Sequence, residues 1–296
     1  MSFRTIAILS PGEMGHAIGL SLAHQGFTII TCLKGRSRRT RQLSKLAKIK
    51  DVKDINLLVT NADLILSILV PSNALEVAGR VASALRETNS ETIFVDCNAV
   101  SPRTAEKMES MISDTGSKFI DASIVGSPPG KETPPRIYVS GKESDLMKQL
   151  AGPNITVVSL GDVVGRASGI KMCYAALTKG TSALHFALLT AAKTMGLSEE
   201  LKQELMFSQS QIYTKMERQL PNIPINAGRW VGEMEEIATT FEQVGIPGKF
   251  HLGAAEIFDL LNKSRFGKET PENFDRNRTL DETISTLAEL LIPNSD

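Results

Sequence analysis

Cysteine and histidine are scarce in this sequence, and neither residue forms a recognisable cluster. Among 296 residues there are three cysteines and four histidines, and no two cysteines form a CxxC motif. Cys32, Cys97 and Cys173 each lie in an apolar stretch, where a cysteine is usually a small buried hydrophobic residue. We therefore expect no disulfide framework, no metal site and a protein of the reducing cytoplasm.

An excess of charge of either sign is also absent. The chain has 33 basic and 33 acidic residues, so its charge balance does not favour nucleic acid or an anionic membrane as a partner. Its apolar runs are broken well before the ~18 residues that a transmembrane helix needs. The sequence from Met1 to Ile6 leads directly into a strand pattern and lacks the architecture of a signal peptide. With 42% hydrophobic residues, the composition is that of a globular protein large enough for two domains.

Strand-like and helix-like segments alternate through the first half of the chain. Short segments rich in apolar and β-branched residues predict strands at residues 5–10, 28–33, 62–70, 92–98, 118–125, 136–140 and 155–159. Helical patterns are found at residues 13–25, 37–48, 73–86 and 102–113. This alternation predicts a doubly wound, mostly parallel Rossmann sheet, whose ligand crevice lies at the carboxyl ends of the strands.

The second half carries no strand pattern. After Gly165 we predict one long helix over residues 166–195, followed by helices at residues 198–220, 225–243, 249–261 and 280–291. The predicted fold class is therefore α/β, with an N-terminal Rossmann domain at residues 1–162. An all-α C-terminal domain, residues 163–296, begins with the long helix.

The turn after the first strand has the pattern of a dinucleotide-binding loop. The segment Ser10-Pro11-Gly12-Glu13-Met14-Gly15 carries the second and third glycines of GxGxxG, with Ser10 at the first position. Gly12 would let the backbone approach a pyrophosphate, and Gly15 would let the helix pack closely on the strand. The start of the helix supplies N–H groups and a partial positive charge. We assign the segment to cofactor binding; an ordinary strand–helix turn is the alternative.

The end of the second strand indicates which dinucleotide binds. NAD-binding domains have Asp or Glu there, ~20 residues beyond the glycines, to bind the ribose 2′-hydroxyl. Residues 33–40 contain no carboxylate and instead contain Arg36, Ser37 and Arg38. Guanidinium groups bind phosphate through paired hydrogen bonds, so these residues predict a clamp for a 2′-phosphate and hence NADP(H). A solvated basic loop is the alternative.

Four blocks of sequence, in order, resemble those of the β-hydroxyacid dehydrogenase superfamily, which includes 6-phosphogluconate dehydrogenase. They are residues 9–15, Val70-Pro71 at a strand end, residues 121–127 at the place of the family's substrate loop, and Gly165-x-Ala167-x3-Lys171. Residues 229–236 resemble a poorly characterised branch with a distinct helical C-terminal domain. The resemblance spans nearly the whole chain.

The resemblance implies roles for further residues. Lys171 would be the general acid/base, which protonates a ketone oxygen as hydride arrives or removes the hydroxyl proton in the reverse direction. Val70 and Pro71 would lie near the nicotinamide side of the cofactor. Asn98 would contact the same half of the cofactor.

The substrate-binding positions depart from the family pattern. The family has Asn four residues after the lysine, where this chain has Ala175. Tyr174 and Thr178 share that helical face, and their hydroxyl groups either take the place of the Asn side chain or simply pack. Val125 replaces a serine that helps hold a substrate carboxylate. The alternative for the segment around Trp230 is an ion-paired helix with a core tryptophan. The remaining candidate substrate contacts are Ser123, Gly126, Ser127, Trp230 and Glu233.

These features together predict an NADP(H)-dependent dehydrogenase or reductase of a small hydroxy/keto substrate, hydroxyacids included. Residues 124–129 also resemble the substrate loop of imine reductases, a related class that generally lacks the lysine. A non-catalytic NADP(H)-binding sensor is a further alternative. The superfamily commonly dimerises across the long helix, which is apolar here on more than one face, so we expect a homodimer.

Overall fold

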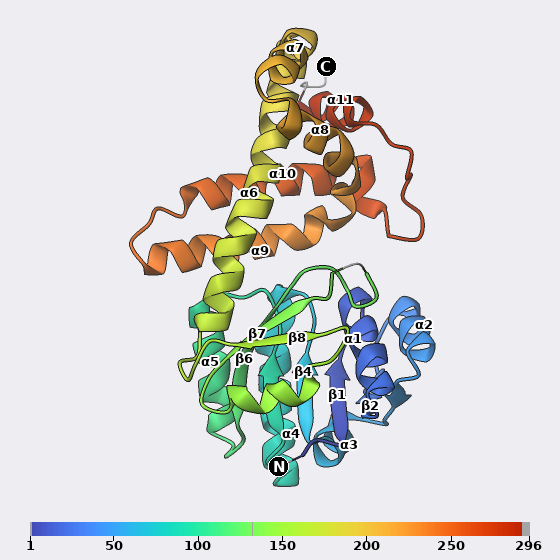
Figure 1. The fold of residues 1–296 in the computed structure, drawn as a ribbon, viewed down its shortest axis with the longest axis vertical. Coiled ribbons are helices and arrows are strands. Elements are labelled where there is room, and N and C mark those ends of the chain that lie inside the picture. Colours follow the sequence, from blue (N-terminus) through green and yellow to red (C-terminus); the bar gives the residue numbers. More distant parts are fainter. Residues whose placement is uncertain (1, 132, 292–296) are drawn as a thin grey trace, which may run out of the picture. The chain divides into compact units, whose positions relative to one another are not determined.

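The computed structural model describes residues 2–131 and 133–291 (Figure 1). The chain divides into two compact units, Met1–Met172 and Cys173–Asp296. We call them the N-terminal unit and the helical unit and describe each by itself. The predicted domain boundary between residues 162 and 163 stays a prediction.

The N-terminal unit is built on one eight-stranded sheet with the order β3-β2-β1-β4-β5-β6-β7-β8. The pairings among β1 to β6 are parallel, whereas β7 runs antiparallel to β6 and parallel to β8. After β3 the chain returns to the other side of β1 with β4, which creates a topological switch point between β1 and β4. The strands are β1 (Thr5–Leu9), β2 (Thr28–Thr31), β3 (Lys50–Asp51), β4 (Leu64–Ser67), β5 (Ile93–Asp96), β6 (Phe119–Val125), β7 (Arg136–Ser140) and β8 (Thr156–Ser159).

Two apolar layers cover the sheet, because successive side chains of a strand point to opposite faces. Ile6 and Ile8 of β1 join a core that includes α1 and η2, whereas Ala7 and Leu9 join the core beneath α3, α4 and α5. A largely parallel sheet requires such cover on both faces. The helical segments of this unit are α1 (Glu13–His24), α2 (Arg38–Leu46), α3 (Ile55–Asn61), η1 (Pro71–Asn73), α4 (Ala74–Thr88), α5 (Pro102–Ser113) and η2 (Ser144–Leu150).

Local signals start two of these helices. Asp54 caps α3, and Ser101 caps α5, whose first residue is Pro102. An Asp or Ser oxygen accepts from N–H groups that a helix start leaves unpaired, and proline has no N–H to lose there.

The helical unit contains the greater part of the long helix α6 (Arg166–Thr194). Its core joins α6 to α9 and α10 through side chains that are almost wholly buried, among them Phe186, Met234 and Phe258. The other elements are α7 (Ser198–Ser208), α8 (Ser210–Gln219), η3 (Leu220–Asn222), η4 (Pro224–Asn226), α9 (Ala227–Gln243), α10 (Lys249–Lys263), η5 (Arg265–Lys268) and α11 (Leu280–Leu291).

The predicted α/β class is confirmed: the sheet is mostly parallel, and within the described residues no strand follows β8. Two segments differ from the prediction. Residues 198–220 contain two helices instead of one, because Gln209 has a φ of −139° and leaves the helical conformation. Residues 50–61, for which the sequence predicts no element, form β3 and α3. Among the described residues, no helix combines the length and apolar character that crossing a bilayer needs.

Candidate active site

The carboxyl ends of the parallel strands form one edge of the sheet, and the loops after them contain most of the predicted site residues. The loops after β1 and β4 are neighbours because these two strands pair directly. Asn98 follows β5, and residues 126–135 follow β6. Doubly wound sheets bind their ligands at this edge, beside the switch point.

The turn from β1 into α1 is tight, and its backbone enters the left-handed region at a residue other than glycine. Ser10 has a φ of +53°, and its carbonyl oxygen accepts from Gly12 N at 2.6 Å. A Cβ on Gly15 would lie 3.3 Å from Ile8 Cγ2, so a larger residue would push α1 away from β1. Gly12, at the N-cap of α1, has no side chain to cap the helix. The first N–H groups of α1 are therefore suited to an anion.

The other residues of this turn have different surroundings. Pro11 is buried, and Met14 packs against the core on one face of the sheet. Glu13 is exposed, and its Oε2 lies 2.7 Å from Arg39 Nη2 in an ion pair that joins α1 to α2. For Glu13, the backbone N–H is thus the group suited to a phosphate, and the carboxylate is not.

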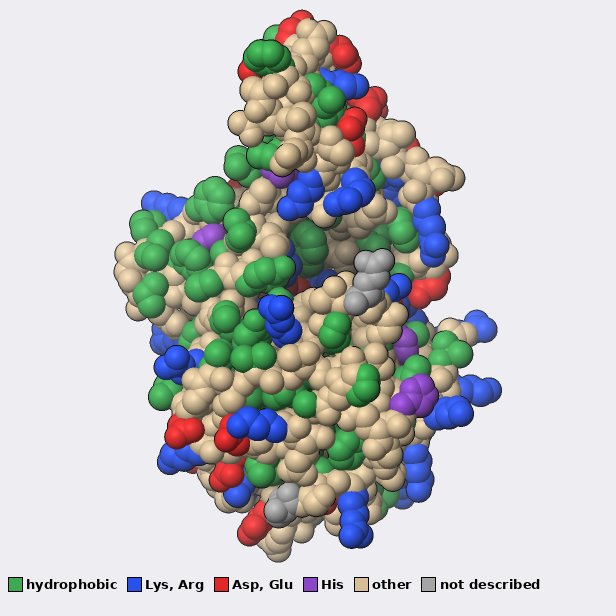
Figure 2. Space-filling model, viewed as in Figure 1, with side chains coloured by type: hydrophobic (Ala, Val, Ile, Leu, Met, Phe, Trp, Pro, Cys, Tyr) green, Lys and Arg blue, Asp and Glu red, His purple; other side chains and the backbone are tan. Residues whose placement is uncertain are grey.

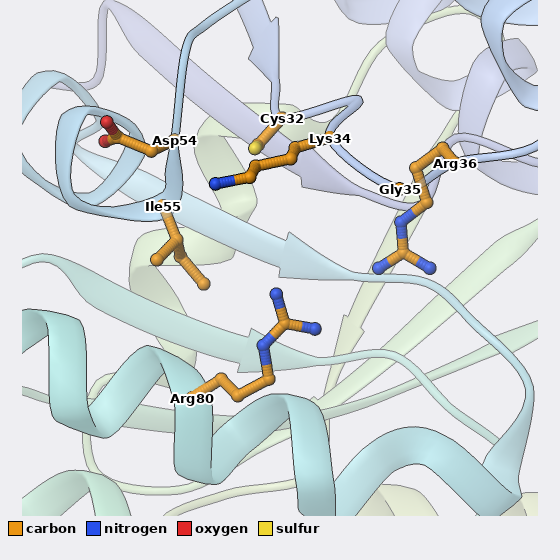
Figure 3. Close-up of a pocket in the computed structure, with 7 residues that line it drawn as sticks. All are labelled: Cys32, Lys34, Gly35, Arg36, Asp54, Ile55 and Arg80. Atoms are coloured by element: carbon orange, nitrogen blue, oxygen red, sulfur yellow. The ribbon is translucent and has the colours of Figure 1, made fainter.

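A pocket of ≈380 Å³ opens beside the loop after β2 (Figure 3). Figure 3 shows the guanidinium groups of Arg36 and Arg80 facing a common space, with the amine of Lys34 extending along its border toward the side of Ile55. The Asp54 carboxylate points away, and its Oδ1 accepts from Leu57 N at 2.9 Å. The pocket therefore concentrates positive charge from two separate elements, the loop after β2 and helix α4. Its lining residues are Cys32, Lys34, Gly35, Arg36, Asp54, Ile55 and Arg80.

Helix α2 starts directly after this loop. Ser37 is its N-cap, with Oγ accepting from Thr40 N at 3.2 Å. Its first turn contains Arg38 and Arg39 and no acidic residue. Positive side chains at the positive end of a helix dipole are unfavourable until an anion binds there. Of the predicted phosphate clamp, Arg36 lines the pocket, Ser37 caps the helix, and Arg38 is exposed at its first residue.

Asn98 is buried and links the loops after β4 and β5 by hydrogen bonds. Its Oδ1 accepts from Leu69 N at 2.6 Å, and its Nδ2 donates to Ser67 Oγ at 3.0 Å and to the Asp96 carboxylate. Only 2% of Asn98 is exposed. The side chain thus fixes the backbone just before Val70, which is the more accessible part of this corner at 38% exposure. The next residue along, which begins η1, is the buried Pro71.

Two buried carboxylates lie side by side beneath this edge. Asp96 of β5 pairs in register with Asp121 of β6, and neither is exposed. Burial, followed by the charge of Asp121, raises the pKa of Asp96 to about 8, despite hydrogen bonds from Asn98. Burial also raises the pKa of Asp121. Hydrogen bonds from Ser168 and other donors act in the opposite direction and partly offset this rise. Since two adjacent buried carboxylates resist ionising together, Asp96 is the neutral partner near pH 7.

Lys171 lies in the first part of α6 and is held against the end of β6. Its Nζ donates to the Ile124 carbonyl oxygen at 2.8 Å. Ile124 immediately precedes the end of β6 at Val125, where the predicted substrate loop continues. The predicted acid/base and the predicted substrate loop are therefore brought together within the N-terminal unit.

The substrate-loop residues differ in accessibility. Ser123 is fully buried, and among the described residues its hydroxyl has no hydrogen-bond partner. Gly126 has a φ of +115°, and a Cβ there would lie 3.3 Å from Pro135 Cα, so this position requires glycine. Gly126 and Ser127 are both exposed, which leaves them available to a ligand.

In the helical unit, Tyr174 and Thr178 lie on an exposed part of α6. Tyr174 is 50% exposed, and Thr178 Oγ1 donates to the Tyr174 carbonyl oxygen at 3.2 Å. Ala175 is buried. A hydroxyl already bonded to its own helix has to exchange that bond to reach a substrate.

Trp230 and Glu233 belong to a buried ionic cluster. Glu233 of α9 pairs with Lys179 of α6, and Arg229 Nη1 lies 3.6 Å from its other oxygen. Lys179 Nζ is 5.4 Å from the centroid of the Trp230 ring, which packs edge-on against Phe258 at 5.1 Å. This arrangement matches the alternative of an ion-paired helix with a packed tryptophan.

Comparison with known proteins adds to this geometry. Residues 5–151 match the NAD binding domain of 6-phosphogluconate dehydrogenase, and residues 192–261 match a domain of unknown function, DUF1932. The chain therefore contains a domain of the 6-phosphogluconate dehydrogenase NAD-binding family, followed by a DUF1932 domain. This confirms the predicted resemblance, including the branch with its own helical C-terminal domain.

Two curated relatives match this chain over part of their own lengths. An uncharacterized 28.5 kDa protein in 7S RNA 5′ region, from Methanothermus fervidus, is 33% identical over 175 residues, 59% of this chain and 66% of that protein. The mitochondrial 3-hydroxyisobutyrate dehydrogenase of Drosophila melanogaster is 26% identical over 181 residues, 57% of this chain and 55% of that enzyme. The match thus spans less than two thirds of either relative.

Solved structures share the fold over most of the chain. A conserved protein of unknown function with structural similarity to 3-hydroxyacid dehydrogenases is 27% identical, with a TM-score of 0.62 over 87% of this chain and 96% of that one. Mycobacterium tuberculosis 3-hydroxyisobutyrate dehydrogenase with L-serine is 17% identical, with a TM-score of 0.66 over 97% and 99%. A Myxococcus stipitatus imine reductase variant with NAD+ is 15% identical, with a TM-score of 0.54 over 89% and 94%. The last two show a common fold alone.

Several residues near the site of this 6-phosphogluconate dehydrogenase-like chain were not predicted from the sequence. Lys34 belongs to the basic run after β2, and this run is the sequence feature that could have identified it as a pocket residue. Arg80 reaches the pocket from α4, and nothing local marks it. The pairing of Asp96 with Asp121 depends on strand order, and that of Lys179 with Glu233 on helix packing.

The left-handed conformation of Ser10 makes a prediction about stability. Glycine adopts this conformation without the steric cost of a Cβ, so Ser10→Gly is expected to raise the free energy of unfolding by up to about 1 kcal/mol. Ser10→Ala keeps the Cβ and serves as the control, with no such gain. Urea denaturation of the three proteins measures the difference. A Ser10→Gly variant less stable than Ser10→Ala would contradict the assignment of strain.

Asp96 makes the stability depend on pH. Its folded-state pKa of about 8 lies above the usual value of 3.8, so between these pH values the folded chain holds a proton that the unfolded chain has lost. The contribution of protonated Asp96 to the free energy of unfolding is complete below pH 3.8. It falls by up to about 1.4 kcal/mol per pH unit as the pH rises toward about 8.

Asp96→Asn cannot ionise and is expected to lack this loss. The measurement is the free energy of unfolding of wild type minus that of the variant, from urea denaturation between pH 5 and pH 8, where it should decline steadily. Asp114→Asn, at the exposed end of α5, is the matched control and should track the wild type. Parallel profiles for wild type and Asp96→Asn would show that Asp96 is ionised in the folded chain.

Proposed function

We propose that this chain is an NADP(H)-dependent oxidoreductase that interconverts a small hydroxy compound and its carbonyl form, with Lys171 as general acid/base. The family of the N-terminal unit supports the dinucleotide and the reaction class. The observation that carries the proposal is the cluster of Lys34, Arg36 and Arg80 around one pocket next to the loop after β2.

The charge of this pocket favours the nucleotide with a 2′-phosphate. Three cations lining one pocket repel each other, and a phosphate dianion relieves that repulsion while accepting charge-assisted hydrogen bonds. The start of α2 adds the positive end of its dipole. The nearby Asp54 carboxylate is bonded to the start of α3, so it does not replace the Asp or Glu that binds a ribose 2′-hydroxyl in NAD-specific domains.

The rest of the cofactor has donors suited to it. The backbone N–H groups of residues 13–15 at the start of α1 suit the pyrophosphate. Val70, which precedes the buried Pro71, gives an apolar wall that we place near the nicotinamide side. Asn98 supports that wall from beneath through its bond to Leu69 N. NADP(H), when bound, supplies or accepts the hydride.

Lys171 supplies the proton in this proposal. An ammonium within reach of a carbonyl oxygen stabilises the negative charge that develops there and then donates a proton to it; the neutral amine takes the proton back in the oxidation. The bond from Nζ to the Ile124 carbonyl holds the amine at the base of the substrate loop. Because general acid–base catalysis needs hydrogen-bond reach, a fixed amine is more effective than a mobile one.

The substrate would bind through backbone and hydroxyl groups around this amine. The N–H groups of the exposed residues Gly126 and Ser127, with the Ser127 hydroxyl, suit a carboxylate or hydroxyl oxygen. The Ser123 hydroxyl, which has no partner among the described residues, is a further candidate but is buried and would have to become accessible. In the helical domain, which we place at residues 163–296, Tyr174, Thr178, Trp230 and Glu233 stay candidates for substrate binding on the sequence pattern alone.

We also propose that the enzyme is a homodimer. Figure 2 shows hydrophobic side chains gathered on a face of the helical unit, and α6 with the adjoining ends of α9 and α10 carries many that are exposed. An apolar surface of this kind favours association with a second chain. The side chains include Leu177, Leu184, Val244, Ile246, Phe250 and Leu252.

Cofactor choice is tested by titrating the chain with NADPH and NADH and following the nicotinamide fluorescence. NADPH is expected to bind more tightly. Arg36→Ala and Arg80→Ala are each expected to raise the Kd for NADPH by about tenfold or more, the size of one lost charge-assisted bond, while the Kd for NADH changes little. Arg86→Ala, exposed on the same helix as Arg80, is the control. Equal affinities that neither pocket variant alters would refute the clamp.

The chemistry is tested by following NADPH oxidation with small aldehydes, keto acids and cyclic imines. Lys171→Met keeps the length of the side chain and is expected to lower kcat for carbonyl substrates by about 10²- to 10⁴-fold without weakening NADPH binding. Lys107→Met, on the exposed face of α5, is the control. Imine turnover that survives Lys171→Met would favour an imine reductase. Tight NADPH binding with no turnover of any substrate would favour a sensor.

A further inference from the structure

The long helix α6 begins without a cap of its own. It starts at Arg166, and the residue before it, Gly165, has a φ of +93° and no side chain that could accept a hydrogen bond. Glycine is required there, because a Cβ would lie 3.1 Å from Pro102 Cβ. The first N–H groups of a helix have no partner within it, and burying them unpaired costs free energy.

Side chains of the sheet bind these N–H groups instead. Asp121 Oδ2 accepts from Gly165 N at 2.9 Å and from Ser168 N at 3.0 Å, and Ser140 Oγ accepts from Ala167 N at 3.0 Å. Ser168 Oγ donates to Asp121 Oδ1 at 2.6 Å, and Ser140 Oγ donates to Asp121 Oδ2 at 2.9 Å. The three side chains are fully buried, so water does not compete for these bonds. The carboxylate also lies at the positive end of the helix dipole.

Lys171 makes the next contact between the same two elements. Ser168 and Lys171 are nearly one helical turn apart on α6, and their partners Asp121 and Ile124 both belong to β6. Two separate contacts with one strand fix the rotation of α6 about its axis as well as its position along β6. A helix joined at Lys171 alone could turn and carry the amine away from the Ile124 carbonyl.

We propose that Asp121 is a positioning residue for Lys171, because its carboxylate fixes the start of α6 and thereby keeps the lysine amine at the Ile124 carbonyl. The value of that position for catalysis rests on the proposed function. The anchoring of the amine does not, and it can be measured without a substrate.

The neighbouring Asp96 favours this role. Its pKa of about 8 keeps it neutral near pH 7, so Asp121 keeps its charge for the helix start without facing a second carboxylate. Four donor groups surround Asp121, which is the environment of a carboxylate and not of an acid that must donate.

The experiment measures the helix start and the lysine separately in the full chain. Trace labelling with acetic anhydride reports the rate at Lys171 relative to exposed Lys107 in the same sample, read by mass spectrometry. Amide hydrogen exchange reports protection at Gly165 and Ser168. Asp121→Ala removes the acceptors. Asp121→Asn keeps a carbonyl oxygen for both N–H groups and an amide that can donate to Ser168 Oγ, so it is the matched control.

In Asp121→Ala we expect amide protection at Gly165 and Ser168 to fall by about tenfold or more, as each loses its acceptor. Labelling of Lys171 should rise toward the rate of Lys107. Asp121→Asn should restore most of both. If Asp121→Ala does not fold, a Ser140→Ala/Ser168→Ala double variant leaves the carboxylate in place and should give the same changes in smaller measure.

Unchanged labelling of Lys171 in the folded variants would overturn the proposal, as would an Asn variant no better than Ala. These failures are distinct from a failure of the proposed function. If labelling responds as expected but Lys171→Met leaves turnover intact, the anchoring stands and the acid/base role is wrong.

Discussion

Strands β1 to β6 pair in one direction, and the remaining features of the N-terminal unit follow from this constraint. A parallel sheet must be covered on both faces, which commits the middle of each strand to apolar packing. Most polar groups then lie at the strand ends and in the loops beyond them, whereas Asp121 and Ser123 are buried within β6. Because β1 to β6 all end at the same edge, residues far apart in the chain lie along it: Ser10, Arg36, Val70 and Asn98.

Electrostatics distinguishes the two sides of this edge. On the β2 side, Lys34, Arg36 and Arg80 line one pocket, and among its described lining residues the one carboxylate, that of Asp54, points away. Such an arrangement costs free energy until an anion binds. On the β6 side, two carboxylates are buried beneath the surface, one neutral and one bonded to the start of α6. The first arrangement suits the phosphate of a nucleotide, and the second suits a rigid support for an amine.

Local patterns predicted the parts of this site whose residues are consecutive. The loop of residues 10–15 and the basic run from Arg36 have signatures that depend on a single turn, and the α/β class follows from alternating periods. The role proposed for Lys171 rests on resemblance, because a lysine in an Ala- and Leu-rich helix has no local mark of such a role. Arg80 and Asp121 could not be assigned, since their surroundings come from strand order and helix packing.

Some helices and strands were not predicted correctly, for comparable reasons. The short polar strand β3 has no period to detect, and its pairing with β2 exists only in the sheet. The break at Gln209 divides a segment whose composition is helical throughout, so the change of direction depends on tertiary packing. The spacing of Trp230 and Glu233 on one helix suggested a binding surface. Their partners in the structure, Phe258 and Lys179, lie on two other helices, which the sequence does not reveal.

The most direct test of the central claim, a cationic pocket built for a 2′-phosphate, is ³¹P nuclear magnetic resonance of NADP+ bound to the chain. The free phosphate monoester takes up a proton near pH 6. In the pocket, the account predicts that the 2′-phosphate resonance stays at its dianion position well below that pH, and that Arg80→Ala restores the titration. A bound 2′-phosphate that titrates like the free nucleotide would contradict the account.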